Sequence, residues 1–367
     1  MNGLSEAGLE RLAQVFDRQI ADGLHPGAQL VVARRGQIVF ERAGGWADVR
    51  RRAPVTLDTP FLVYSATKPF TAVCVHQLAE RGQLDLDAPV ARYWPEFGCR
   101  GKETATLRHA LLHQAGVPRR GFYRQAFLWP DWERTMQSVA RLDAEYPPGS
   151  STAYHVVNYG FILGEVVRRV AGCPIQEYLR REFLEPLGMR NSYPGLPDNQ
   201  RRRAASVYCG DWQQIGAAFI FNVPRYRRWF LPAASLNTTA RDLATFYQML
   251  LDGGQHGERR YLKPETIAEA TALRWEGRDA NSGMNMRWAM GFHLGGLSAF
   301  PDRDIRAMGR KSAARTFGHS GQGGSAFAWA DPEADLVFAF VNNRLLGAVE
   351  AHLRFEVLAN AVWDAVI

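Results

Sequence analysis

Apolar positions near both ends of the chain repeat with the periods of helices and strands. An amphipathic helical pattern opens the chain, and two β-rich runs then flank "RRGQ" at 34–37, the second of them alternating apolar with polar residues. Towards the other end, "SAFAWA" and "LVFAFVNN" flank the turn signal "DPEAD" at 331–335. A last amphipathic helix covers 348–367. We therefore predict a hairpin and a helix in each terminal part.

The middle of the chain has a different pattern. From about residue 99 to 236 the helical period dominates, as in "VVNYGFILGEVVRRVAG" at 156–172, and no internal repeat is evident. We therefore predict an α/β (α+β) domain from residues 1–98 and 237–367, with an antiparallel sheet flanked by helices. An all-α inserted domain is expected over residues 99–236.

The stretch "YSATKPF", Tyr64 to Phe70, begins one of the predicted helices. Apolar residues follow a helical period from Phe70 to Ala79, and Gly82 marks the end. Ser65 should therefore lie at the helix start, among free backbone amides and at the positive end of the dipole.

Lysine is rare in this chain. Of 44 basic residues only Lys68, Lys102, Lys263 and Lys311 are lysines, and the rest are arginines. Lysine can lose its proton when its surroundings lower its pKa, whereas arginine cannot. Ser65 and Lys68 are three residues apart, so a helix brings them together. We interpret Lys68 as the base that activates the Ser65 hydroxyl.

Two further stretches contain groups that could take part in catalysis. Tyr154 lies in "PPGSSTAYHVVNYG"; a phenol near a lysine can relay a proton, and its pKa falls when cations surround it. In "FGHSGQGGS", the glycines allow the backbone to pass close to a ligand and to turn an amide towards it. Such an amide can supply half of an oxyanion hole.

In this order, "SATK", "YHV" and "HSG" resemble the three motifs of the serine β-lactamase and penicillin-binding-protein superfamily. The surrounding phrases "LRHALLHQAGV", "TTARDLATF" and "FGHSGQGGS" are similar too. The resemblance covers about Gly27 to Arg344 and is closest to class C β-lactamase-like esterases of the family VIII carboxylesterase type. It implies a β-lactamase/transpeptidase-like fold and an acyl-enzyme mechanism without a cofactor or metal.

The resemblance also implies roles for the catalytic residues. Ser65 would be the acylated nucleophile, Lys68 its base partner, and Tyr154 an assistant in proton transfer. Whether Lys68 or Tyr154 is the base stays open, because the two groups should titrate as a coupled pair.

The third motif would form the other wall of the site. The backbone amides of Ser65 and Gln322 would make the oxyanion hole, and His319 would lie beside the attacked carbonyl. Ser320 and Gly321 would line the same pocket.

Departures from the family pattern bear on the substrate. Val156 replaces an asparagine that would donate to a peptide-like acyl group, and Asn158 matches a different position. His319 and Ser320 replace lysine and threonine, and a histidine is mostly neutral at pH 7. Both changes favour esters of small or apolar acids over penicillins. The aromatic stretch Tyr208–Phe230 either lines the pocket or packs the insertion.

Three rival interpretations are weaker. The net charge of +7 comes with short arginine clusters and no nucleic-acid motif. "GHSGQ" nearly matches a nucleophile elbow around Ser320, but the next segment is β-rich rather than helical. "HALLH" spaces His109 and His113 like metal ligands, without the glutamate of H-E-x-x-H.

Other functions of the same superfamily stay open: a β-lactamase, a D-amino-acid peptidase, an acyltransferase or a non-catalytic peptide-binding relative. No apolar run reaches about 18 residues, and the first residues lack a secretory pattern. Four scattered cysteines form no CxxC pair. We expect a cytoplasmic protein with a small-molecule ester as partner and neither nucleic acid nor membrane.

Overall fold

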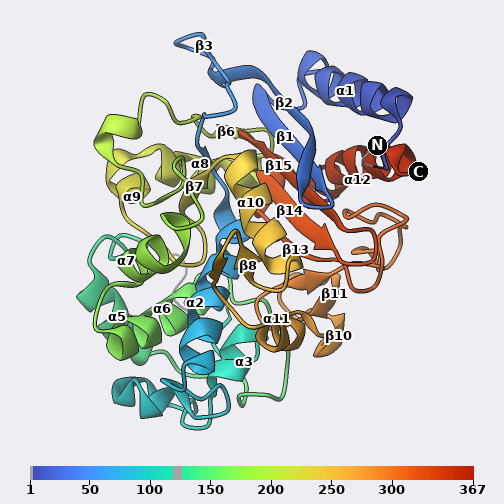
Figure 1. Cartoon of the computed structure of the whole chain (residues 1–367). Coiled ribbons are helices and arrows are strands. Elements are labelled where there is room, and N and C mark those ends of the chain that lie inside the picture. Colours follow the sequence, from blue (N-terminus) through green and yellow to red (C-terminus); the bar gives the residue numbers. More distant parts are fainter. Residues whose placement is uncertain (1–2, 119–125) are drawn as a thin grey trace.

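A nine-stranded sheet dominates the computed structural model, which describes residues 3–118 and 126–367 (Figure 1). Its order is β10-β11-β12-β13-β14-β15-β1-β2-β3, and each strand is antiparallel to its neighbours. The strands are β1 (Gly27–Arg34), β2 (Gln37–Asp48), β3 (Ala53–Pro54), β10 (Trp275–Arg278), β11 (Asn285–Trp288), β12 (His293–Leu294), β13 (Phe317–Ser320), β14 (Ala326–Asp331) and β15 (Leu336–Asn342).

The interior strand β1 is buried along its whole length, because helices cover both faces of the sheet. Val31 and Ala33 face the larger apolar core, whereas Leu30 and Val32 face a smaller one. This alternation is the period of two that a pleated strand imposes.

Helices α1 (Glu6–Ala21) and α12 (Ala348–Ala365) lie side by side on one face of the sheet (Figure 1). Leu12 and Phe16 of α1 and Leu358 and Val362 of α12 fill the smaller core with that face. Both termini lie here, and the amide of Ser5 donates to the carbonyl of Ala365.

On the opposite face, α10 packs against β1, β14 and β15, and α2 packs against α6. The larger core runs without a break from the sheet into these helices. The helices on this side are α2 (Lys68–Glu80), α3 (Leu107–Leu111), α5 (Trp132–Ala140), α6 (Asn158–Ala171), α7 (Ile175–Leu179), α8 (Ile215–Asn222), α9 (Pro224–Arg228), α10 (Ala240–Leu251) and α11 (Pro264–Thr271).

Short elements connect these layers. They are the strands β4 (Phe61–Leu62), β5 (Tyr193–Pro194), β6 (Tyr208–Cys209), β7 (Leu236–Thr238), β8 (Gln255–His256), β9 (Arg259–Arg260) and β16 (Arg344–Leu345), and the turns η1 (Tyr64–Thr67), η2 (Val90–Arg92), η3 (Pro95–Phe97), η4 (Arg180–Leu184), η5 (Asp198–Gln200), η6 (Trp212–Gln214) and η7 (Gln322–Gly324). Within the described ranges, no helix is long and apolar enough to cross a membrane.

The predicted fold class is confirmed: an antiparallel sheet is flanked by helices and takes its strands from both terminal parts of the chain. The two predicted hairpins are β1–β2 and β14–β15. The described residues between 99 and 236 form helices, the short strands β5 and β6, and the first residue of β7. Their division from the rest as a separate domain stays a prediction.

Candidate active site

Ser65 lies in the 3₁₀ turn η1, directly before α2. Its neighbour Tyr64 has a φ of 46°, which is uncommon for a residue other than glycine and is typical of functional turns. The side chain of Ser65 borders a cavity of about 650 Å³ while the residue as a whole is only 8% exposed. The expected position at a helix start is therefore correct, with the added detail of the 3₁₀ turn.

Lys68 is completely buried beneath Ser65. Its Nζ lies 3.2 Å from Ser65 Oγ, 2.9 Å from the carbonyl oxygen of Val156 and 3.3 Å from that of Ala233. Burial lowers the pKa of the Lys68 amine well below its ordinary value, since removal from water disfavours the charged form. The site thus holds an amine that loses its proton readily.

Tyr154 precedes α6 and lies against the same amine. Lys68 Nζ is 4.6 Å from the centroid of the Tyr154 ring, and that ring stacks on Trp288 at 5.7 Å. Burial raises the pKa of the Tyr154 phenol, and its hydrogen bond with Ser65 acts in the opposite direction. Because burial is the largest effect, the pKa of the Tyr154 phenol lies above its ordinary value, contrary to the expected fall.

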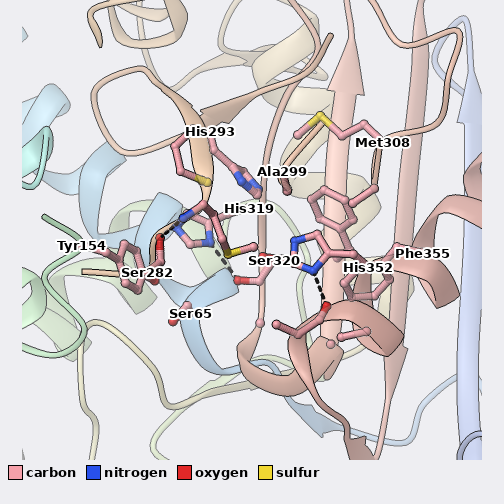
Figure 2. A pocket seen from close by; sticks show the side chains of 18 of the residues that line it. Ser65, Tyr154, Ser282, His293, Ala299, Met308, His319, Ser320, His352 and Phe355 are labelled. Carbon is pink, nitrogen blue, oxygen red and sulfur yellow. Dashed lines mark hydrogen bonds between the residues drawn. The ribbon is translucent and has the colours of Figure 1, made fainter. Parts of the chain in front are cut away.

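The end of β13 forms the opposite wall (Figure 2). His319, Ser320, Gly321 and Gln322 all line the cavity that Ser65 and Tyr154 line. His319 is 3% exposed, its Nδ1 lies 2.8 Å from the carbonyl oxygen of Ser320, and its Nε2 is buried without a partner among the described residues. Burial lowers its pKa well below the usual value, so the ring is neutral.

Two short turns border the cavity. Ser65 is the second residue of η1, and Gln322 is the first residue of η7. The first backbone N–H groups of a helical turn have no acceptor within that turn. These two amides are therefore available to a ligand, as an oxyanion hole requires.

Gly321 joins the two walls. A Cβ added at Gly321 would lie 2.5 Å from the carbonyl oxygen of Val63, two residues before Ser65. No real Cβ tolerates that distance, so the close approach of sheet and nucleophile turn requires glycine here. The first and third motifs are in this way held together by direct backbone packing.

The structure shows the positions at which the sequence departs from the family's motifs. Val156 lines the cavity with an apolar side chain, although its carbonyl oxygen accepts from Lys68. Asn158 points away, and its Nδ2 donates to the carbonyl oxygen of Val117. Of the aromatic stretch Tyr208–Phe230, only Gln214 lines the cavity. Its Oε1 accepts a hydrogen bond from Gln322 Nε2. The stretch therefore does not form the pocket: Phe221 and Phe230 are buried in the helical part, whereas Trp212, Ile215 and Phe219 are exposed.

Two rival sites are not formed. His109 belongs to the capping box of α3, whereas His113 lies beyond its end with a φ of 60°, so the two do not share a helical face. Ser320 is followed by η7 and strand β14, which is not the helix of a nucleophile elbow. In the described part of the chain, no three or more His, Cys, Asp or Glu side chains are grouped to bind a metal.

Sequence reasoning missed Arg354, on α12. This guanidinium is 3% exposed and, across residues 3–118 and 126–367, makes no ion pair with a carboxylate. Its Nη2 donates to the carbonyl oxygens of Gly324 (2.7 Å) and Gly323 (3.1 Å), within the turn that begins at Gln322. Arginine is common throughout this chain, so no signal in the sequence marks this one.

Comparison with known proteins agrees with this geometry. Residues 12–362 match the Beta-lactamase family. The chain belongs to that family. Its members named below include esterases, so the family places the chain among serine hydrolases of the β-lactamase and penicillin-binding-protein type.

Three relatives show the range of this Beta-lactamase family. The chain is 32% identical over 350 residues to "Esterase/beta-lactamase LipL" of Mycobacterium tuberculosis, covering 87% of this chain and 77% of the relative. It is 31% identical to a penicillin-binding-protein homologue from Caulobacter crescentus, with a TM-score of 0.82 and 99% of both chains covered. It is 30% identical to a solved family VIII carboxylesterase, again with a TM-score of 0.82 and 99% of both chains covered.

Proposed function

We propose that this protein is a carboxylesterase that cleaves esters of small or apolar acids through an acyl-enzyme at Ser65. The observation that supports this proposal most directly is the buried Lys68 amine, 3.2 Å from Ser65 Oγ and with a lowered pKa. The esterase names of LipL and of the family VIII structure point the same way.

The contacts of Lys68 suit a neutral amine. Two N–H groups donate to the carbonyl oxygens of Val156 and Ala233, which can only accept. The remaining lone pair then faces the Ser65 hydroxyl, which can donate. In the first step the Ser65 proton passes to Lys68 Nζ while Oγ forms a bond to the ester carbon.

Tyr154 completes the proton path. A phenol whose pKa is raised keeps its proton at neutral pH and can donate it. As the carbon–oxygen bond to the alcohol breaks, Tyr154 gives its proton to the departing oxygen and regains one from Lys68. Water then attacks the acyl-enzyme along the reverse path and releases the acid.

The oxyanion hole would carry much of the barrier lowering. The amides of Ser65 and Gln322 would donate to the carbonyl oxygen as it becomes negative, and one such donor contributes about 3 kcal/mol in a well-studied serine hydrolase. The neutral His319 beside them adds no charge, and burial alone lowers the pKa of the Lys68 amine.

Cleavage of lactams or D-amino-acid peptides is the second candidate, because LipL is named an esterase and a beta-lactamase. The apolar Val156 cannot donate to the amide of such a substrate, and no lysine occupies the position of His319. We therefore place esters first and expect ester turnover to exceed penicillin or cephalosporin turnover by a large factor.

The test uses Ser65→Ala and an active-site phosphonate. The native protein should hydrolyse p-nitrophenyl acetate and gain the mass of the phosphonate at Ser65, and Ser65→Ala should lose both properties. Retained hydrolysis in Ser65→Ala would overturn the proposal, and an unreactive native protein would favour a binding-only relative. A panel with a lactam, a D-Ala-D-Ala peptide and a competing alcohol then separates the remaining activities.

A further inference from the structure

The cavity that begins at Ser65 extends well beyond the reacting atoms. It passes His319 and Ser320 and continues to the first turns of α12, where His352 and Phe355 line it (Figure 2). About 650 Å³ is the size of a site for a drug-sized ligand, and an acetyl ester would fill only a small part of it. The far part of the cavity is therefore large enough to bind a further group of the substrate.

We define this far part as the distal chamber, lined by Ala299, Met308, Phe327, His352 and Phe355. Met308, Phe327 and Phe355 also belong to the smaller core, between the sheet and the pair α1–α12. The chamber thus opens from the catalytic cavity into an apolar interior. An apolar group that entered it would leave water at a favourable free energy.

The polar groups of the distal chamber are uncharged. His352 Nδ1 lies 2.7 Å from the carbonyl oxygen of Ala348, one turn earlier on α12, and burial lowers the pKa of the ring. No carboxylate lines the cavity within the described residues. A charged substrate group would find no opposite charge on an acidic side chain there.

The two arginines that line the cavity are already occupied. Arg287 pairs with Glu276 at 2.9 Å, and its Nη1 donates to the carbonyl oxygen of Gly295. Arg306 pairs with Asp304 at 2.9 Å. Each cation is already paired with a carboxylate, so neither arginine offers an unpaired charge to a ligand.

We propose that the distal chamber binds a long alkyl chain or an extended aromatic group of the ester while Ser65 attacks the carbonyl. This inference rests on the proposed esterase function and adds a substrate class: uncharged esters with one large apolar arm. The arm lies between β13 and α12, and its end contacts Met308, His352 and Phe355.

Two ester series test this proposal. One lengthens the acyl side, from p-nitrophenyl acetate to the octanoate; the other lengthens the alcohol side, from ethyl acetate to octyl acetate, all below micelle-forming concentrations. In at least one series, kcat/KM should rise at least tenfold from the short to the long ester. If kcat/KM rises with chain length in neither series, the proposal is wrong.

A matched pair of variants locates the effect. Ala299→Trp fills the distal chamber from a partly exposed position, and it should cut the long-to-short ratio of kcat/KM at least tenfold. Ala314→Trp makes the same change at an exposed alanine nearby that does not line this cavity, and it should leave the ratio as in the native protein. A native ratio in a folded Ala299→Trp protein would contradict the proposal.

A binding experiment separates this inference from the esterase proposal. p-Nitrophenyl octyl ether is neutral and cannot be hydrolysed. Calorimetric titration of this ether into the native and Ser65→Ala proteins therefore measures binding without any contribution from ester cleavage. We expect binding to both, and at least tenfold weaker binding of p-nitrophenyl methyl ether. If no ester is cleaved but the octyl ether binds, only the esterase proposal fails. Equal affinity for the two ethers would contradict the proposal that the distal chamber binds an apolar arm.

Discussion

At the scale of single residues, two buried lysines differ in the partners of their amine groups, and this difference supports the proposed role of Lys68 as a base. Lys102 Nζ donates to three carbonyl oxygens, those of Cys99, Ala140 and Leu142, which match the three N–H groups of an ammonium. Lys68 has two carbonyl oxygens, and its third partner is the Ser65 hydroxyl. Only Lys68 can therefore accept a proton without losing a partner.

We predict that Lys68→Arg is as damaging as Lys68→Ala. A guanidinium keeps its proton, so it cannot take one from Ser65, and general-base catalysis contributes about a hundredfold to ten-thousandfold. Both variants should lose at least a hundredfold in kcat/KM for p-nitrophenyl acetate. Lys311→Arg, at an exposed ion pair with Asp364, is the matched control and should behave like the native protein.

The same argument fixes the sign of the pH dependence. Protonated Lys68 cannot accept the Ser65 proton, so activity should fall as the pH decreases through the lowered pKa of this amine. Activity at neutral pH is expected only because that pKa is lowered. A near-native Lys68→Arg enzyme, or a rate that rises towards acid pH, would contradict the role of Lys68.

At the scale of elements, α12 supports the turn that carries the Gln322 amide. Arg354 reaches from this helix to the carbonyl oxygens of Gly323 and Gly324, and Asn342 Nδ2 donates to the latter as well. The Gln322 amide shares its peptide unit with the carbonyl of Gly321, which accepts from the Gly324 amide, so contacts that hold this turn also hold the Gln322 amide in its orientation. We therefore expect Arg354 to be a positioning residue, which acts on the proposed oxyanion hole through the backbone of η7.

We predict that Arg354→Met lowers kcat for a short ester about tenfold or more and changes KM little. An amide out of place weakens mainly the transition state, where the negative charge develops. Arg310→Met, at an exposed arginine that pairs with Glu356 of the same helix, is the control and should leave kcat unchanged. An equal rise in KM with native kcat would assign Arg354 to substrate binding instead.

Elements with a strong local signal could be predicted from the sequence. The β14–β15 hairpin follows from its apolar runs and turn, and α2 from its period and from Gly82, which has a φ of 70°. The residues that line the cavity could not be predicted in this way. Trp288, His293 and His352 come from β11, β12 and α12, and no local pattern shows that the sheet order brings these elements beside Ser65.

At the scale of the whole molecule, the site lies where the sheet meets the helical part. Ser65 and Tyr154 come from the helical side, and Gln322 follows the sheet strand β13. The two sides touch at Gly321, which packs against the carbonyl oxygen of Val63. In the proposed mechanism, the distance between the Ser65 hydroxyl and the Gln322 amide therefore depends on both sides.

We predict that Gly321→Ala lowers kcat/KM for p-nitrophenyl acetate about tenfold to a hundredfold, because a Cβ 2.5 Å from the Val63 carbonyl oxygen must push the two walls apart. The backbone φ of −93° suits alanine, so strain in the dihedral angle is not the cause. Gly216→Ala, at a helical glycine with open space around it, should leave both kcat/KM and the melting temperature near the native values.

A side-chain neighbour of that Cβ offers a second check. The added Cβ would also meet Ser325 Oγ, a side-chain atom that Ser325→Ala removes. Because the Val63 carbonyl is backbone and stays in place, Gly321→Ala combined with Ser325→Ala should remain as slow as Gly321→Ala alone. Full recovery in the double variant would mean that the two walls tolerate the methyl group, and that their separation is not what limits the reaction.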